Sequence, residues 1–142
     1  MKNYLLDTNV VSEWVKPRPN SNVIRWLADI DEDTVYLSVV TFAEVAHGVA
    51  EMPPGRRRDA LKSWLEKDLY LRFERRILLV DFPVASAWGK LMALRRRSGV
   101  TLNPMDAFFA ATAGVHSLTL VTRNTKHFDK AGISTFDPWL PS

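Results

Sequence analysis

The sequence predicts an α/β protein built on a parallel sheet, and two patterns along the chain support this fold class. Short apolar runs, typical of buried strands, alternate with longer segments whose apolar residues recur at helical spacing. Parallel strands need a long crossover between them, usually a helix, and the longer segments can supply it. A layered arrangement of helices packed on a sheet is therefore expected.

Five segments are expected to form the strands of this sheet. We predict a brief buried strand at 4–6, further strands at 34–38, 77–80 and 118–121, and a short fifth strand at 133–136.

The expected helices begin and end at residues that cap or break helices. A first helix follows residues 4–6 and ends at Lys16-Pro17, and Asn20 or Ser21 caps the second. Further helices are predicted over about 42–51, from Arg56 onward, from Pro83 to Ser98-Gly99, and over 104–114. The helix from Arg56 is expected to bury one apolar face, made of Ala60, Leu61, Trp64, Leu65 and Leu69.

Composition indicates one globular domain spanning 1–142. A chain of 142 residues with 46% hydrophobic and 25% charged residues can bury a substantial core and does not resemble a disordered segment. No apolar run approaches the length of a membrane helix, and the N-terminus lacks the features of a secretory signal. Cysteine is absent, which excludes disulfides, thiolate zinc sites and thiol catalysis. We expect a cytoplasmic protein with no membrane partner.

The positive charge of the chain is clustered. The net charge is +3, and arginines gather at 56–58, at 72 with 75–76, and at 95–97. Such clusters can bind the phosphate backbone of a nucleic acid, but they are more often solvated helix faces.

Four polar groups stand at the ends of apolar segments, and three of them carry a carboxylate. They are Asp7, Glu44, Asp106 and the triplet Thr122-Arg123-Asn124. Because the carboxyl ends of parallel strands meet at one crevice, these distant side chains can gather at one place. Two unit charges 4 Å apart repel by about 4 kcal/mol at an effective dielectric of 20, and a divalent cation relieves that repulsion. An all-oxygen ligand set suits magnesium or manganese and disfavours zinc.

Helix capping is the competing interpretation for each acid taken alone. Thr41 and Glu44 have the spacing of a capping box, and Asn103 followed by Pro104 with Asp106 in the first turn is typical of a helix N-terminus. Capping does not explain why separate elements place an acid on the same side of the sheet, so the joint occurrence favours a site.

The remaining polar motifs give no other chemistry. His47, His116 and His127 do not form a metal-ligand pattern, although His47 lies one turn beyond Glu44. The sequence contains no glycine-rich phosphate loop, dinucleotide fingerprint or Ser-His-Asp set.

The chain resembles the PIN domain family, and within it the VapC-type, FitB-like ribonuclease toxins of bacterial toxin–antitoxin systems. The resemblance is carried by four segments in order, LLDTNVVSE, LSVVTFAEVAHGV, MDAFFAATA and VTRN, and by the late FDPW at 136–139. It implies a three-layer α/β/α sandwich with a central parallel sheet and a metal-dependent endoribonuclease activity.

The resemblance also assigns roles to individual residues. Asp7, Glu44 and Asp106 match the acidic residues that bind Mg²⁺, or alternatively Mn²⁺, while Thr8 and Thr122 match supporting hydroxyl positions. The fourth acidic position falls on Asn124, which can orient a water but supplies no charge, so occupancy by one metal or two stays open. Arg123 is a candidate phosphate contact, and either Glu44 or a hydroxide on the ion accepts the proton.

The implied partners are an RNA substrate, in single-stranded or looped form, and a small cognate antitoxin. A homodimer is expected, with DNA contacted only through the antitoxin complex. The five tryptophans and the aliphatic face of 60–69 could serve these interfaces, but core packing is the favoured explanation for most of them.

Two rival functions fit parts of the pattern. A catalytically decayed PIN-like module that binds RNA or protein would explain Asn124, although Asp7, Glu44 and Asp106 are retained. A phosphatase or receiver-like domain also places aspartates at strand ends. However, Asp7 lacks a second Asp two residues later, and LTLVTRN offers no lysine.

Overall fold

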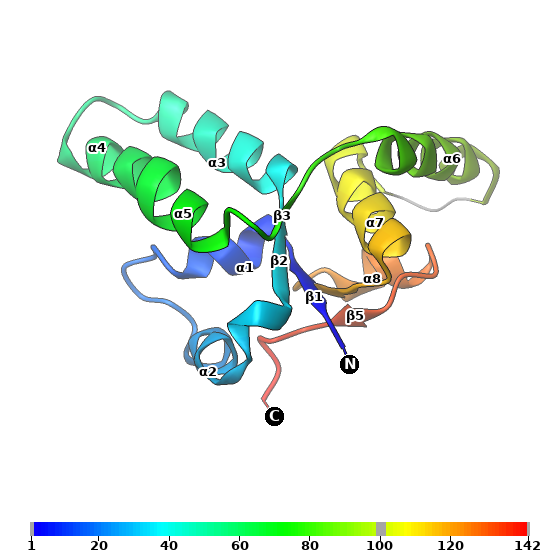
Figure 1. The fold of residues 1–142 in the computed structure, drawn as a ribbon, viewed down its shortest axis with the longest axis horizontal. Coiled ribbons are helices and arrows are strands. Elements are labelled where there is room, and N and C mark those ends of the chain that lie inside the picture. The colour runs from blue at the N-terminus through cyan, green and yellow to red at the C-terminus, as the bar shows by residue number, and fades with distance from the viewer. Residues whose placement is uncertain (1, 99–101, 142) are drawn as a thin grey trace.

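A five-stranded parallel sheet forms the centre of the computed structural model, which describes residues 2–98 and 102–141 (Figure 1). The order of the strands across the sheet is β3-β2-β1-β4-β5. The strands are β1 (Tyr4–Leu6), β2 (Val35–Ser38), β3 (Ile77–Leu78), β4 (Thr119–Val121) and β5 (Thr135–Phe136). A strand is present at each of the five predicted places, and all the pairings are parallel. The prediction over 77–80 is half wrong, because β3 ends at Leu78 and the exposed Leu79 and Val80 lie outside it. The fifth strand begins at Thr135, two residues later than predicted.

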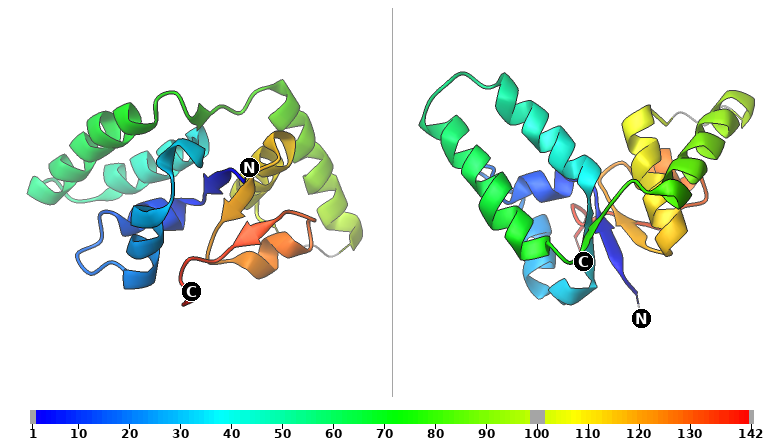
Figure 2. Two further views of the ribbon diagram at one scale, coloured as in Figure 1. Left: turned by 60° about the horizontal axis from the view of Figure 1, so that its bottom comes forward. Right: turned by 45° about the horizontal axis from the view of Figure 1, so that its top comes forward.

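Helices cover both faces of the sheet, so the predicted three-layer α/β/α sandwich is confirmed. In Figure 1 and the right view of Figure 2, α1 to α5 lie on one side of the sheet and α6 to α8 on the other. The helical segments are α1 (Thr8–Glu13), α2 (Ser21–Asp29), the short 3-10 helix η1 (Glu32–Thr34), α3 (Val39–Glu51), α4 (Arg56–Ser63), the π-helix η2 (Trp64–Leu69), α5 (Tyr70–Phe73), α6 (Phe82–Ser98), α7 (Pro104–His116) and α8 (Thr125–Asp129). Among the described residues, no helix is long and apolar enough to cross a membrane.

Side-chain alternation along the central strands divides the apolar residues between two cores. Leu6 and Val121 point to the core on the α1–α5 side, whereas Leu5 and Leu120 point to the core on the α7–α8 side. All four side chains are fully buried. Because both faces are covered, the central strands read as continuous apolar runs in the sequence.

Two helix boundaries differ clearly from the prediction. The helix expected from about 42 begins at Val39, because the Ser38 hydroxyl accepts the Val40 N–H at 3.0 Å and caps it. The first helix ends at Glu13, short of Lys16-Pro17, and Asn20 caps α2 by accepting the N–H groups of Asn22 and Val23. Gly99, predicted to end α6, lies outside the described residues.

The buried face of the helix after Arg56 is only partly as predicted. Leu65, Leu69 and Phe73 are buried, but Ala60 is exposed. The segment Trp64–Leu69 is a π-helix, and its wider turn changes which residues face the core.

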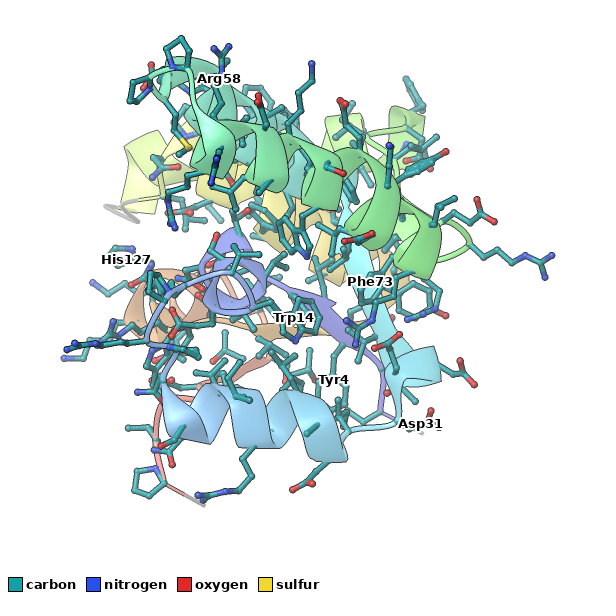
Figure 3. All side chains as sticks on the ribbon, turned by 90° about the vertical axis from the view of Figure 1, so that its left-hand side faces the viewer. Tyr4, Trp14, Asp31, Arg58, Phe73 and His127 are labelled. Carbon is teal, nitrogen blue, oxygen red and sulfur yellow. The ribbon has the colours of Figure 1, made fainter. Side chains whose placement is uncertain are left out.

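The tryptophans pack into the protein, as favoured from the sequence. Trp14, Trp26, Trp64 and Trp139 lie against the core on the α1–α5 side, and Trp88 stacks on Phe108 with ring centroids 5.0 Å apart. Figure 3 shows Trp14 and Phe73 close together in the interior, where their ring centroids are 6.0 Å apart.

Candidate acidic site at the strand ends

Asp7 lies where β1 ends and is fixed there by both backbone and side chain. Its N–H donates to the Val121 carbonyl at 2.9 Å, which continues the β1–β4 pairing by one residue. Its Oδ1 accepts the Thr8 N–H at 2.7 Å, so Asp7 is also the N-cap of α1. Its Oδ2 accepts the Thr122 hydroxyl at 2.7 Å, from a threonine that follows β4 and is fully buried. Two adjacent strand ends therefore hold one carboxylate.

Glu44 reaches the same place from α3 through Thr8. The Thr8 hydroxyl donates to Glu44 Oε1 at 2.7 Å, and it lies 3.0 Å from the Thr41 hydroxyl. Because a hydroxyl carries a single proton, Thr41 must donate to Thr8 when Thr8 donates to Glu44. A relay from Thr41 through Thr8 thus orients the Glu44 carboxylate.

Asp106 joins the site from the first turn of α7. Its N–H donates to the Asn103 side chain at 2.8 Å, and Pro104 occupies the start of the helix, as predicted for an N-terminus. The negative charge of Asp106 acts on Asp7, and Glu44 acts on both aspartates. The three acids therefore share one electrostatic environment.

Burial and mutual repulsion make two of these carboxylates hard to ionise. The pKa of Asp7 is raised to about 6. Burial is the main cause, and the charges of Asp106 and Glu44 add to it, while the hydrogen bonds from Thr122 and Thr8 act in the opposite direction. Burial also raises the pKa of Asp106, where a positive charge on His127 works in the opposite direction.

The capping interpretation holds in part. Asp7 does cap α1, and Asn103 caps α7. The capping box of Thr41 and Glu44 is wrong, because α3 begins at Val39 and both residues lie within it. Glu44 is thus free of a capping role, and its carboxylate instead accepts from Thr8.

The Thr122-Arg123-Asn124 triplet divides into a buried and an exposed part. The Thr122 hydroxyl accepts the Asn124 N–H at 3.1 Å, while the Asn124 side chain is exposed. The Arg123 guanidinium lies over the Trp139 ring, 5.3 Å from its centroid, and its charge acts on Glu13. A phosphate-binding role for Arg123 stays a prediction.

The oxygen ligands of the acidic residues suit a hard cation such as Mg²⁺, although the described side chains do not form a preformed metal site. Across residues 2–98 and 102–141, no three His, Asp or Glu side chains lie close enough together to hold a metal ion as they stand. The donors are nevertheless all oxygen, and Asp7 carries a raised pKa that a nearby positive charge would lower. The residues therefore fit the class of ion that the sequence suggested.

Two residues near this site were not assigned to it from the sequence. The local spacing predicts a cap for Thr41, and only the packing of α3 beside α1 brings it to Thr8. A charge on His127, in α8, acts on Asp106, and the signal in the sequence is its place shortly after the VTRN segment, with only Thr125 and Lys126 between. His47, in contrast, is exposed and pairs with Glu51 on its own helix.

Comparison with known proteins agrees with this geometry. The PIN domain family matches residues 4–133, a segment that contains Asp7, Glu44, Asp106 and Asn124. This chain belongs to the PIN domain family. Toxin FitB of Neisseria gonorrhoeae is 40% identical over 135 residues, which cover 95% of this chain and 97% of that protein.

Two further proteins extend the comparison of this PIN domain. The VapC ribonuclease Y4jK of Sinorhizobium fredii is 36% identical over 97% of this chain and 99% of its own length. The solved structure of FitAB bound to an IR36 DNA fragment superposes with a TM-score of 0.91 at 37% identity, covering 98% of this chain and 97% of that chain. The rival phosphatase and receiver-like folds are excluded by this family membership.

Proposed function

We propose that this PIN domain is a divalent-metal-dependent endoribonuclease that acts as the toxin of a toxin–antitoxin pair. The observation that carries the proposal is the coupling of Asp7, Glu44 and Asp106 at one edge of the parallel sheet, with Thr122 and Thr8 bonded to two of them. The similarity to a VapC ribonuclease and to toxin FitB supports the choice of reaction and role.

In this proposal Asp7, Asp106 and Glu44 hold Mg²⁺ or Mn²⁺. When bound, the ion would activate a water and neutralise charge on the scissile phosphate. The Thr122 hydroxyl and the Thr8 N–H keep the Asp7 carboxylate in one orientation, and Thr8 does the same for Glu44. Asn124 would bind a water through its amide group. Because the amide is neutral, Asn124 would add no negative charge to hold a second ion.

The raised pKa of Asp7 links the site to pH. A carboxyl with a pKa of about 6 is largely ionised at pH 7.5 and largely protonated at pH 5. Since the ionised form binds a cation, we propose that the protein holds its ion poorly at pH 5 and better at pH 7.5.

The test is cleavage of a mixed pool of structured RNAs by the purified protein, freed of any copurified partner, with magnesium, manganese or EDTA. Asp7→Asn is the site variant, and Asp59→Asn, an exposed residue on α4, is the matched charge control. We expect cleavage that requires the ion, is lost in Asp7→Asn and persists in Asp59→Asn.

Other outcomes would redirect the proposal. Cleavage that survives EDTA and Asp7→Asn would come from a contaminating ribonuclease. Failure to cleave any RNA, by folded protein that binds Mn²⁺, would favour a decayed module that binds RNA or protein, for which the neutral Asn124 is the supporting feature.

The proposal includes partners. An antitoxin would cover the acidic site, and DNA would be bound only by the toxin–antitoxin complex, by analogy with the DNA-bound FitAB structure. A homodimer would use the apolar residues that follow the edge strand β3, since Leu79 is 62% exposed and Phe82 84% exposed. The cytoplasm, where RNA and such a partner are available, is the proposed location.

A further inference from the structure

Most of the arginine clusters in the sequence do not explain how an RNA strand would be held at the acidic site. Arg72 and Arg76 are tied to Glu32, and their guanidinium groups lie over Trp14 and Phe73. Figure 3 shows Arg58, on α4, far from His127 on α8. Other basic residues, closer to the acidic site, are therefore the better candidates for phosphate contacts beside it.

Helix α8 and its C-cap residue carry basic side chains near the acidic site. Lys126, His127 and Lys130 are exposed and, with Asp129, line a surface hollow of about 370 Å³. Asp129 accepts the Thr135 hydroxyl at 3.1 Å. Within the described part of the chain, no ion pair involves Lys126 or Lys130, so both ammonium groups can meet an outside anion.

The chain connects this helix directly to the acidic residues. Thr122, which donates to Asp7, also accepts the N–H of Asn124, and Asn124 is the N-cap residue of α8. His127 is the α8 residue whose charge acts on Asp106. Helix α8 begins at Thr125, soon after β4 ends at Val121, and so it starts from the edge of the sheet where the strands end. Figure 3 shows His127 at the left of the view and Asp31, which precedes β2, at the lower right.

We infer that Lys126, His127 and Lys130 form a subsite for the RNA phosphate backbone beside the acidic centre. Lys126 and Lys130 are four residues apart, about 6 Å along a helix axis, and so can contact two phosphates of one strand. His127, whose charge acts on Asp106, would mark the end of the subsite nearest the scissile bond. This inference rests on the proposed function, because it assumes that the polyanion brought to the acidic residues is RNA.

The test measures binding of a fluorescent single-stranded RNA to cleavage-silenced protein. Asp7→Asn is the background, and Lys126→Gln/Lys130→Gln is compared with Arg56→Gln/Arg57→Gln, which removes the same charge from exposed positions on α4. His127 is kept, so that the charge facing Asp106 is unchanged. Thermal unfolding of each variant verifies that these surface changes leave the fold intact.

We expect the lysine variant to bind RNA more weakly and with less salt dependence. Each phosphate contact to a single strand contributes about 0.7 to the slope of log K against log salt, so two lost contacts lower the slope by about 1.4. At 0.1 M salt this corresponds to about a 25-fold rise in Kd. The α4 variant should remain within about twofold of the background. Equal affinity and slope in the two charge variants would overturn the inference.

Cleavage by the wild-type protein with Mg²⁺, run in parallel, separates this inference from the proposed function. Cleavage together with lysine-independent binding would overturn the subsite alone. Lysine-dependent binding without any cleavage would support the subsite and overturn the nuclease. Failure of the background protein to bind RNA at low salt would overturn the subsite, whatever the cleavage result.

Discussion

At the scale of single residues, Asp7 shows how a site can oppose stability. Its carboxylate accepts two hydrogen bonds, yet burial outweighs them and raises its pKa to about 6. In the unfolded chain the same group has a pKa of about 3.8. Because the folded chain holds the proton more tightly, the free energy of unfolding falls as pH rises from about 4 to about 6. Without an ion, the protein is thus destabilised at pH 7 by its own site.

The variant Asp7→Asn is therefore expected to be more stable than the wild type in metal-free buffer at pH 7. The pKa difference corresponds to about 3 kcal/mol, and we expect a gain of about 1 to 3 kcal/mol because the amide replaces only part of the hydrogen bonding. Urea unfolding in EDTA at pH 7 and at pH 4 measures it. The gain should vanish at pH 4, and a gain of equal size at both pH values would contradict the explanation.

Thr122→Val tests the hydrogen bond to Asp7. The hydroxyl lowers the pKa of Asp7, so its removal should raise that pKa above 6 and extend the fall in stability to higher pH. The free energy of unfolding at pH 7 should decrease by about 1 to 2 kcal/mol. NMR titration of the Asp7 carboxyl is the measurement. Thr122→Ser, which keeps the hydroxyl, should titrate close to the wild type.

At the scale of elements, one arginine cluster joins a helix to a strand. Arg76 follows α5, donates to the backbone carbonyls of Glu32 and Val35, and lies over the Phe73 ring at 4.7 Å. Its own carbonyl accepts the Leu37 N–H at 2.9 Å. This arginine therefore fixes α5 and η1 against β2, which is a structural role.

Arg76→Ala is expected to lower the free energy of unfolding by roughly 2 kcal/mol. The carbonyls of Glu32 and Val35 lose a charged hydrogen-bond donor, and the Phe73 ring loses its cation–π contact. Its neighbour Arg75, which is exposed, offers a matched control, and Arg75→Ala should change stability by less than about 0.5 kcal/mol. Urea unfolding measures both. If the RNA affinity of Arg76→Ala fell while its stability did not, the structural role would be wrong.

At the scale of the whole molecule, the sheet separates two well-filled cores but leaves apolar side chains exposed past one edge. Beyond β3, Leu79, Val80 and Phe82 are exposed, whereas the preceding Ile77 and Leu78 are half-buried. Burying a large apolar side chain contributes about 1.5 to 3 kcal/mol, so this surface can stabilise contact with a second copy.

Leu79→Ser/Phe82→Ser should weaken self-association at least tenfold, since it removes the two most exposed side chains of that surface. Size-exclusion chromatography with light scattering over a range of concentrations measures the effect. Val115→Ser, an exposed apolar residue on α7, is the control. A parent protein that stays monomeric throughout, or a double variant that associates as the parent does, would exclude this surface.

The sequence by itself determined the strands, the parallel sheet and the acidic residues at its edge. A strand that is buried on both faces appears in the sequence as an uninterrupted run of apolar residues. Asp7 and Thr122 each follow such a run immediately, so the local pattern was sufficient to place them at strand ends. The starts of α2 and α7 were also predictable, because Asn20 and Asn103 bond to N–H groups within three residues.

Only the tertiary structure decided what depends on residues far apart in the chain. Thr8 lies 36 residues before Glu44, and Asp7 lies 115 residues before Thr122, so their hydrogen bonds exist only once the strands are paired. The same holds for the role of Thr41, which local spacing assigned to a cap, and for Arg76, which local charge assigned to a cluster. Local pattern sets which residues form an element. The pKa of Asp7 and the position of α8 beside Asp106 depend on how the elements pack, since burial and charge act across space.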